Sequence, residues 1–224
     1  MADVGALRSQ QLSAPGAGAP ARRFDAEFGL NFVVAALLVL FLLPLLIALA
    51  GAVFLQDGGP VIFVQRRIGR NGRPFPCFKL RSMAVDAETR LQSLLANDPA
   101  ARADWERDHK LKSDPRVTAL GRFLRTSSLD ELPQLFNIMR GEMSLVGPRP
   151  IVQAELSRYG RHSTTYCSVR PGITGLWQVS GRNDVSYRKR VAMDVLYARS
   201  KSLPLDLKII ALTIPAVLLK RGCY

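Results

Sequence analysis

The stretch Ser127-Ser128-Leu129-Asp130-Glu131-Leu132-Pro133-Gln134 places two adjacent carboxylates directly before an amphipathic segment. Apolar residues recur from there at the helical spacing i, i+3, i+4 and i+7, at Leu132, Leu135, Phe136 and Met139. This spacing predicts a short helix from Asp130 to Gly141, because Pro133 would fall in the first turn, where proline is tolerated. The acidic pair would lie at the helix N-terminus, where the dipole lowers carboxylate basicity.

Two interpretations of Asp130 and Glu131 follow. In the first, Asp130 is a helix cap and Glu131 a first-turn charge, which together stabilise the helix by about 1 kcal/mol. In the second, the pair serves a polyanionic substrate such as a pyrophosphate, because guanidinium groups are dense on both sides of it. These groups belong to Arg122, Arg125, Arg140 and Arg149. Helix capping requires none of these arginines, so the second interpretation is favoured.

The composition of the 224-residue chain indicates one globular domain with an appendage. Its net charge of +13 suits nucleic acid, an anionic membrane surface or a phosphorylated substrate as partner. We expect no nucleic-acid binding, because the aromatic residues are scattered and no nucleic-acid motif occurs. The cysteines Cys77, Cys167 and Cys223 lack the paired spacing of a zinc site and are expected to be free thiols.

A charge-free apolar run over residues 32–55 is long enough, at about 1.5 Å per residue, to cross a hydrocarbon layer of about 30 Å. Residues 1–22 are rich in small and polar residues and are expected to form a disordered tail. The run is too long for an ordinary cleaved signal, which leaves a spanning helix or a re-entrant hairpin. Pro44 near its middle and arginines on both flanks favour a re-entrant helix hairpin over residues 23–56, with both ends on the cytoplasmic face.

Residues 57–224 are expected to form one small, mostly helical domain, so that the predicted fold class is α+β. β-Branched and aromatic runs at residues 61–65 and 75–80 predict a β-hairpin, with Asn71-Gly72 as a turn between them. A helical pattern over residues 86–111, with a break at Asn97-Asp98-Pro99, predicts a helix pair.

Two further helices are expected in this domain. One covers residues 116–125, is capped by Asp114-Pro115, and delivers Arg125 five residues before Asp130. The other is an apolar amphipathic segment at residues 206–219, which Pro215 is expected to break and which we place on the bilayer surface.

Two later loops each combine an arginine with glycines. Arg170 precedes Pro171-Gly172, and Arg182 follows Gly181. Glycine lets backbone N–H groups approach an anion closely, and the guanidinium adds charge. Arg170 and Arg182, together with Arg149, are therefore predicted to bind an anionic substrate.

Several motifs in a fixed order resemble the bacterial sugar transferases known as monotopic phosphoglycosyl transferases. The resemblance covers the chain from about residue 24 to the end. Within the family, the segments 177–178, 183–187 and 221–224 most resemble exopolysaccharide initiators that load galactose phosphate on a lipid carrier. The motifs are Lys79-Leu80-Arg81-Ser82-Met83, Asp114-Pro115-Arg116, Ser128-Leu129-Asp130-Glu131-Leu132-Pro133-Gln134, Ser144-Leu145-Val146-Gly147-Pro148-Arg149-Pro150, Arg170-Pro171-Gly172-Ile173-Thr174-Gly175 and Ser180-Gly181-Arg182-Asn183.

The resemblance implies transfer of a hexose 1-phosphate from a UDP-sugar to undecaprenyl phosphate, with release of UMP. It implies that Asp130 is the nucleophile, which forms a phosphosugar-aspartate, and that Glu131 holds Mg²⁺. Lys79, Arg81 and Arg125 are expected to hold the diphosphate with the metal ion. A re-entrant anchor in the inner membrane, with the catalytic domain on the cytoplasmic face, is implied as well.

Two other function classes fit parts of the same pattern. A lipid-phosphate or pyrophosphate hydrolase also needs a membrane anchor, basic clusters and an acidic pair, but its final acceptor is water. A non-catalytic adaptor could use the positive face to bind anionic lipid headgroups. The motifs leave open whether galactose or glucose is transferred and whether the protein forms a homodimer.

Overall fold

The computed structural model describes residues 26–108, 111, 114–181 and 185–218. The predicted tail at residues 1–22 lies outside the described residues. The strands are β1 (Ile62–Ile68), β2 (Pro74–Leu80), β3 (Ser144–Val146) and β4 (Gly172–Thr174). The helices are α1 (Ala26–Asp57), α2 (Ala87–Asn97), α3 (Pro99–Asp108), α4 (Ala119–Ser127), α5 (Gln134–Met139), α6 (Gln153–Leu156), α7 (Ser163–Cys167), α8 (Leu176–Val179), α9 (Tyr187–Ser200) and α10 (Leu203–Leu218). Mixed helix and short strand content agrees with the predicted α+β class.

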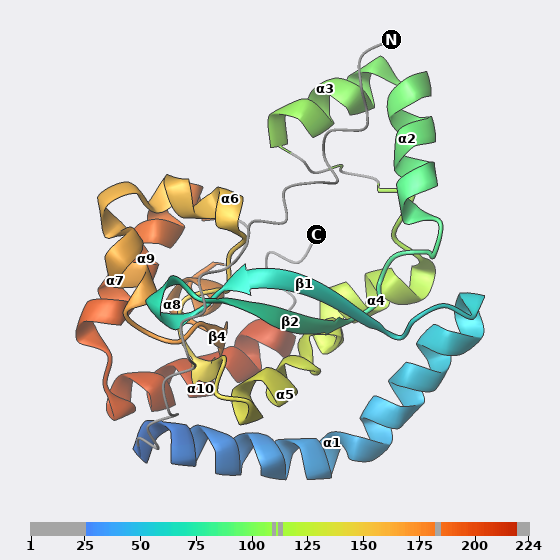
Figure 1. Cartoon of the computed structure of the whole chain (residues 1–224). Coiled ribbons are helices and arrows are strands. Elements are labelled where there is room, and N and C mark those ends of the chain that lie inside the picture. The colour runs from blue at the N-terminus through green and yellow to red at the C-terminus, as the bar shows by residue number, and fades with distance from the viewer. Residues whose placement is uncertain (1–25, 109–110, 112–113, 182–184, 219–224) are drawn as a thin grey trace, which may run out of the picture.

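Helix α1 extends beneath the rest of the molecule and bends about halfway along its length (Figure 1). It is one helix of 32 residues with Pro44 inside it, whereas the sequence predicted two helices separated by a break. Proline removes one helical hydrogen bond, and the bonds of the neighbouring turns keep the helix continuous while it bends. By length and composition α1 could cross a membrane.

The part of α1 that faces inward belongs to the hydrophobic core. Ala35 packs in one cluster with Leu135 and Ile138 of α5. Further along α1, Leu49 and Val53 pack in a second cluster with residues that include Leu80 of β2 and Leu124 of α4. The predicted membrane segment thus shares its packing with the elements that follow it in sequence.

The predicted β-hairpin is confirmed as an antiparallel pair of β1 and β2, in which Ile62 lies opposite Leu80 and Gln65 opposite Cys77. Strand β1 extends to Ile68, three residues beyond the predicted end. The Asn71-Gly72 turn has positive φ angles of 60° and 72°, which asparagine and glycine adopt more readily than other residues.

The predicted helix pair is confirmed as α2 and α3. The Asp98 carboxylate accepts hydrogen bonds from the backbone N–H groups of Ala100 and Ala101, at 2.9 and 3.0 Å, and so caps α3. The pair was expected to lie on the domain as a lid or brace, but it projects away from the body of the molecule (Figure 1).

The second sheet was not predicted. It pairs β3 and β4 in parallel, with Ser144 opposite Gly172 and Val146 opposite Thr174. Helix α10 packs near this sheet, where Ile209 joins Val146 and Tyr197 in a buried cluster. The predicted break at Pro215 is wrong, because Pro215 lies inside α10.

Candidate active site

The acidic pair lies in a turn between two helices. Helix α4 is capped by Thr118, whose hydroxyl accepts a hydrogen bond from Gly121 N–H at 2.9 Å, and ends before Ser128, which has a φ of 58°. Leu129–Glu131 then form a 3-10 turn. Helix α5 begins only at Gln134, four residues after the predicted start at Asp130, because the preceding turn is closed by 3-10 hydrogen bonds, from Glu131 N–H to the Ser128 carbonyl and from Leu132 N–H to the Leu129 carbonyl. The predicted cap at Asp114-Pro115 is likewise replaced by Thr118.

The Lys79 ammonium group bridges the two carboxylates. Its Nζ atom lies 2.7 Å from Oε1 of Glu131 and 3.5 Å from Oδ2 of Asp130. Lys79 belongs to strand β2, whereas Asp130 and Glu131 follow it by 51 and 52 residues in the sequence. The tertiary structure therefore brings these three residues together. The structure therefore places Lys79, which was predicted to bind the diphosphate, against Asp130 and Glu131.

The two carboxylates differ in their electrostatics. Burial raises the pKa of Asp130 above its usual range, and Lys79 opposes that rise. For Glu131 burial acts in the same direction, but the charges of Lys79 and Arg149 outweigh it and lower its pKa. The sequence had predicted lowered basicity for both from a helix N-terminus; the pKa of Asp130 is instead raised, and that of Glu131 is lowered by neighbouring cations. Glu131 is thus the more firmly ionised member of the pair.

A small cavity of about 10 Å³ lies beside Glu131. Cations from three segments line it, namely Arg67 of β1, Lys79 of β2 and Arg149 of the loop after β3. The remaining lining residues are Cys77, Glu131, Gln134, Pro150, Gly172, Ile173 and Gln178. Three cations around one ionised carboxylate give this small cavity a net positive charge, which suits a phosphate group.

The loop that carries Arg149 is fixed from two sides. The Tyr166 hydroxyl donates a hydrogen bond to the Arg149 carbonyl at 3.0 Å, and Arg67 donates one to the Pro150 carbonyl at 3.1 Å. The Arg149 guanidinium lies 5.9 Å from the ring centre of Trp177. The predicted substrate residue Arg149 is therefore held at the cavity by packing and hydrogen bonds.

Other predicted site residues lie elsewhere. Arg125 donates a hydrogen bond to the Ser82 hydroxyl at 2.9 Å, and its charge opposes the raised pKa of Asp130. Arg81 pairs with Asp57 at the end of α1. Arg170 donates a hydrogen bond to the Gly141 carbonyl at 3.3 Å, and it also contacts the start of α1, where it lies 5.8 Å from the ring centre of Phe28. Arg182 lies outside the described residues.

Arg67, Gln134 and Gln178 line the cavity and were not predicted to do so. Arg67 was within reach of prediction, because the hairpin register places it opposite Phe75, on the same face of the sheet as Cys77 and Lys79. Gln178 comes from α8, which no pattern connected with the hairpin.

The donors available for a metal ion are the two carboxylates. Within the described residues no group of three or more His, Cys, Asp or Glu side chains is arranged to hold a metal ion. Magnesium in phosphoryl-transfer sites is usually held by one or two carboxylates together with substrate phosphates. Asp130 and Glu131 supply that number of hard oxygen donors, so the residues fit a magnesium ion that is shared with a bound phosphate.

Known proteins match this chain over most of its described length. A family model described as bacterial sugar transferase matches residues 25–220. The chain is 56% identical over 169 residues to an undecaprenyl-phosphate galactose phosphotransferase of Salmonella typhimurium, a match that covers 75% of this chain. It is 51% identical over 203 residues to a UDP-galactose-lipid carrier transferase of Erwinia amylovora, which covers 91% of this chain.

These two relatives are longer proteins, and the matches cover only 36% and 41% of their lengths. A third relative is closer in size. The exopolysaccharide production protein ExoY of Sinorhizobium fredii is 47% identical over 222 residues, which covers 99% of this chain and 93% of that protein. The family model covers all of the described residues, including α1, the hairpin and the acidic pair. The chain therefore belongs to the bacterial sugar transferase family.

Proposed function

We propose that this protein transfers a hexose 1-phosphate from a UDP-sugar to undecaprenyl phosphate, as the first membrane step of exopolysaccharide synthesis. The observation that carries the proposal is the contact of Lys79 with Asp130 and Glu131 beside a cation-lined cavity. Membership of the bacterial sugar transferase family supports it, as do the names of relatives that transfer galactose or glucose phosphate to this lipid carrier.

Binding of the donor uses the charges that surround the cavity. Arg67, Lys79 and Arg149 offset the negative charges of the diphosphate, and Gln134 and Gln178 provide amide groups for hydrogen bonds. Phosphoryl transfer depends mostly on such alignment and charge neutralisation. Arg125, Arg170 and Arg182 were predicted to contribute as well, and their contacts with substrate remain predictions. Arg81 was predicted to do the same, and its contacts with the end of α1 favour a different role.

In the first chemical step, an oxygen of the Asp130 carboxylate attacks the phosphorus that bears the sugar. A P–O bond forms to Asp130 while the bond from that phosphorus to the UMP oxygen breaks, and UMP leaves with the electron pair. In the second step, an oxygen of undecaprenyl phosphate attacks the same phosphorus. The bond to Asp130 then breaks, which restores the carboxylate and releases a lipid-linked diphosphate sugar.

Lys79 has a specific task in this scheme. Burial favours the neutral form of Asp130, which cannot act as the nucleophile, and the adjacent ammonium charge favours the carboxylate. Glu131 would hold Mg²⁺ at the cavity, with Asp130 beside it. A bound magnesium ion supplies positive charge to the phosphate oxygens during transfer.

The direct test uses membranes that contain the protein, undecaprenyl phosphate and either UDP-galactose or UDP-glucose. UMP and a lipid-linked diphosphate sugar should appear together, with galactose as the preferred sugar because the relatives named for galactose are the more similar ones. Release of free sugar phosphate without a lipid product would indicate a hydrolase. Failure with every UDP-sugar would refute the transferase.

The donor alone provides a second test. With radiolabelled UDP-sugar and no lipid acceptor, the covalent scheme predicts label on Asp130 and one equivalent of UMP. UMP that appears only when acceptor is present, with no labelled protein, would support direct displacement instead.

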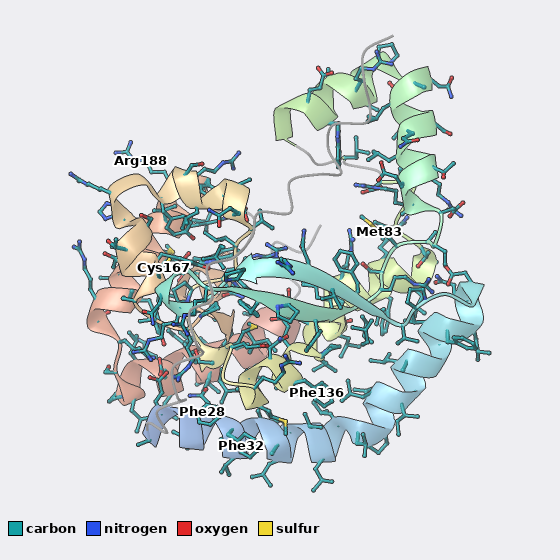
Figure 2. All side chains as sticks on the ribbon, in the orientation of Figure 1. Phe28, Phe32, Met83, Phe136, Cys167 and Arg188 are labelled. Carbon is teal, nitrogen blue, oxygen red and sulfur yellow. The ribbon has the colours of Figure 1, made fainter. Side chains whose placement is uncertain are left out.

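We further propose that α1 enters and leaves the inner membrane from the cytoplasmic side. Its outward face carries strongly exposed apolar residues such as Phe41 and Leu55, at 80% and 84% exposure. Phe28 and Phe32 lie along the same helix, whereas Arg188 lies on the side of the molecule away from it (Figure 2). Exposed apolar residues of α10, among them Leu207 and Ile214, would add to the membrane contact.

Thiol labelling tests this topology. Single cysteines at Ser13 and Ser202, in a variant without the three native cysteines, should both resist an impermeant reagent until the inner membrane is breached. Labelling of the Ser13→Cys variant alone, in cells whose outer membrane is permeable, would indicate a spanning helix. Pro44→Leu should shift the protein toward that spanning form, because it restores a straight helix of matching length.

A further inference from the structure

The Arg81 side chain is directed at the C-terminal end of α1. It is only 8% exposed, and its Nη2 atom donates hydrogen bonds to the Val53 carbonyl at 3.2 Å and to the Asp57 carboxylate. The other Asp57 oxygen accepts a hydrogen bond from the backbone N–H of Val85 at 3.2 Å. One carboxylate on the last turn of the membrane helix is therefore bound to two points just after β2.

This contact lies immediately beside elements of the active site. Lys79 precedes Arg81 by two residues, and Ser82 follows it. The Ser82 hydroxyl accepts the hydrogen bond from Arg125, and the Ser82 carbonyl accepts one from the Thr118 N–H at 3.3 Å. Thr118 caps α4, the helix that leads into the acidic pair. Residues 79–82 thus connect the end of α1, the bridging lysine and the helix before Asp130.

The burial of Arg81 separates it from the substrate cavity. Its Nε and Nη1 atoms are buried and have no hydrogen-bond partner among the described residues. A Cβ atom added to Gly59 would lie 2.0 Å from Nη1, so the backbone covers the guanidinium closely. Lys79 lines the cavity and Arg81 does not. A phosphate in the cavity could reach these nitrogen atoms only if α1 or the Gly58-Gly59 turn moved.

We propose that Arg81 is a positioning residue, which locks the end of the membrane helix to the strand that carries Lys79. The Arg81–Asp57 ion pair fixes α1 against β2, and the position of β2 sets the distance from Lys79 to the acidic pair. Docking of α1 is thereby coupled to assembly of the active site. The proposal rests on the proposed transferase function only for its activity readout.

The test is a double-mutant cycle with Arg81→Met, Asp57→Asn and the two combined. Asp57→Asn leaves a buried charge without its partner, and the double variant removes both charges. We expect each single variant to lower kcat about tenfold, with KM for the UDP-sugar within about twofold, and the double variant to be no worse than either single variant. Arg90→Met and Asp86→Asn are the matched control, because that ion pair is exposed at the start of α2.

A second readout does not depend on catalysis. Val53 is 1% exposed and packs against the core, so a Val53→Cys reporter in a variant lacking the native cysteines reports opening of α1 by its rate of thiol labelling. We expect Arg81→Met and Asp57→Asn to raise this rate at least about fivefold, and the control pair to leave it unchanged.

The two roles of Arg81 give opposite results. If Arg81 binds the donor phosphate, Arg81→Met should raise KM for the UDP-sugar, Asp57→Asn should have little effect, and the labelling rate of Val53→Cys should stay at its original value. That outcome would overturn the positioning role. If the transferase proposal itself fails, no variant shows activity. The labelling rates still support or overturn the proposal that Arg81 and Asp57 hold α1 against β2.

Discussion

Asp130 and Asp194 are both buried carboxylates, with 7% and 1% of their surfaces exposed, and burial raises the pKa of each. Their partners differ. Asp130 lies 3.5 Å from the Lys79 ammonium group, next to Glu131 and the cavity. Asp194 of α9 instead accepts a hydrogen bond from the Tyr159 hydroxyl at 2.7 Å.

The difference concerns the charge state that each site favours. A cation beside a buried carboxylate favours the ionised form, whereas a phenol supplies one hydrogen bond and no full charge. The pKa of Asp194 is raised to about 7, mainly by burial, although Tyr159, Arg149 and Arg190 oppose the rise. Its Oδ1 atom has no hydrogen-bond partner within the described part of the chain. Asp130 is thus suited to nucleophilic chemistry, and Asp194 to joining α9 to the turn that contains Tyr159.

The largest difference in turnover is expected when each aspartate is replaced by asparagine. Asp130→Asn should lower turnover by at least about 1,000-fold and abolish labelling by the donor, because an amide cannot attack phosphorus. Asp194→Asn should keep turnover within about tenfold of the wild type. UMP release and radiolabel on the protein measure both, and near-normal activity of Asp130→Asn would exclude the covalent scheme.

Lys79→Met removes the cation that distinguishes the two sites. Turnover should fall about 100-fold, and the acidic limb of the pH profile of kcat/KM should move to higher pH, because Asp130 then loses the charge that opposes its raised pKa. The pH profile is the decisive measurement. A lower rate with an unmoved acidic limb would mean that Lys79 serves only donor binding.

Glu131→Gln leaves the nucleophile in place and removes the more firmly ionised carboxylate. We expect turnover to fall about 30-fold and the Mg²⁺ concentration needed for half-maximal rate to rise. Labelling by the donor should persist, which separates this variant from Asp130→Asn. An unchanged magnesium dependence would remove Glu131 from the metal site.

Asp194→Asn should change how the stability of the folded protein depends on pH. The folded state raises the pKa of this acid from its ordinary value near 4 to about 7, so the folded protein holds a proton that the unfolded chain releases in that interval. Stability from this group is therefore present at low pH and is lost as pH rises from about 4 to 7. Between pH 5 and 8 the Tm of the wild type should fall by about 5 °C more than that of Asp194→Asn. Parallel curves in a thermal unfolding assay would contradict this.

The features predicted correctly were local ones. The β-branched and aromatic runs on both sides of Asn71-Gly72 predicted the hairpin, and Asn97-Asp98-Pro99 predicted the boundary between α2 and α3. Each depends on residues that are close in sequence, where turn and cap preferences decide the backbone. The second sheet was missed because β3 and β4 have three residues each and pair across 28 positions, which leaves no periodic pattern.

The arginines of the predicted site also separate into one that the motifs placed correctly and two whose positions depend on the fold. Arg149, Arg81 and Arg170 all occur in motifs that predicted anion binding, and only Arg149 lines the cavity. Arg81 and Arg170 make their contacts with opposite ends of α1, through Asp57 and through Phe28. A guanidinium binds whichever acceptor the fold brings near it, and the position of α1 could not be read from the loops themselves.

The sequence alone determined the acidic pair, the basic motifs around it, the apolar run with its proline and the family resemblance, because these are properties of residue type and spacing. The tertiary structure decided which cations meet the carboxylates. Lys79 reaches Asp130 and Glu131 from a strand about 50 residues earlier, while packing of α1 against β2 directs Arg81 away from the cavity. Charge neutralisation acts through distance and burial, and both are fixed only when distant segments pack together.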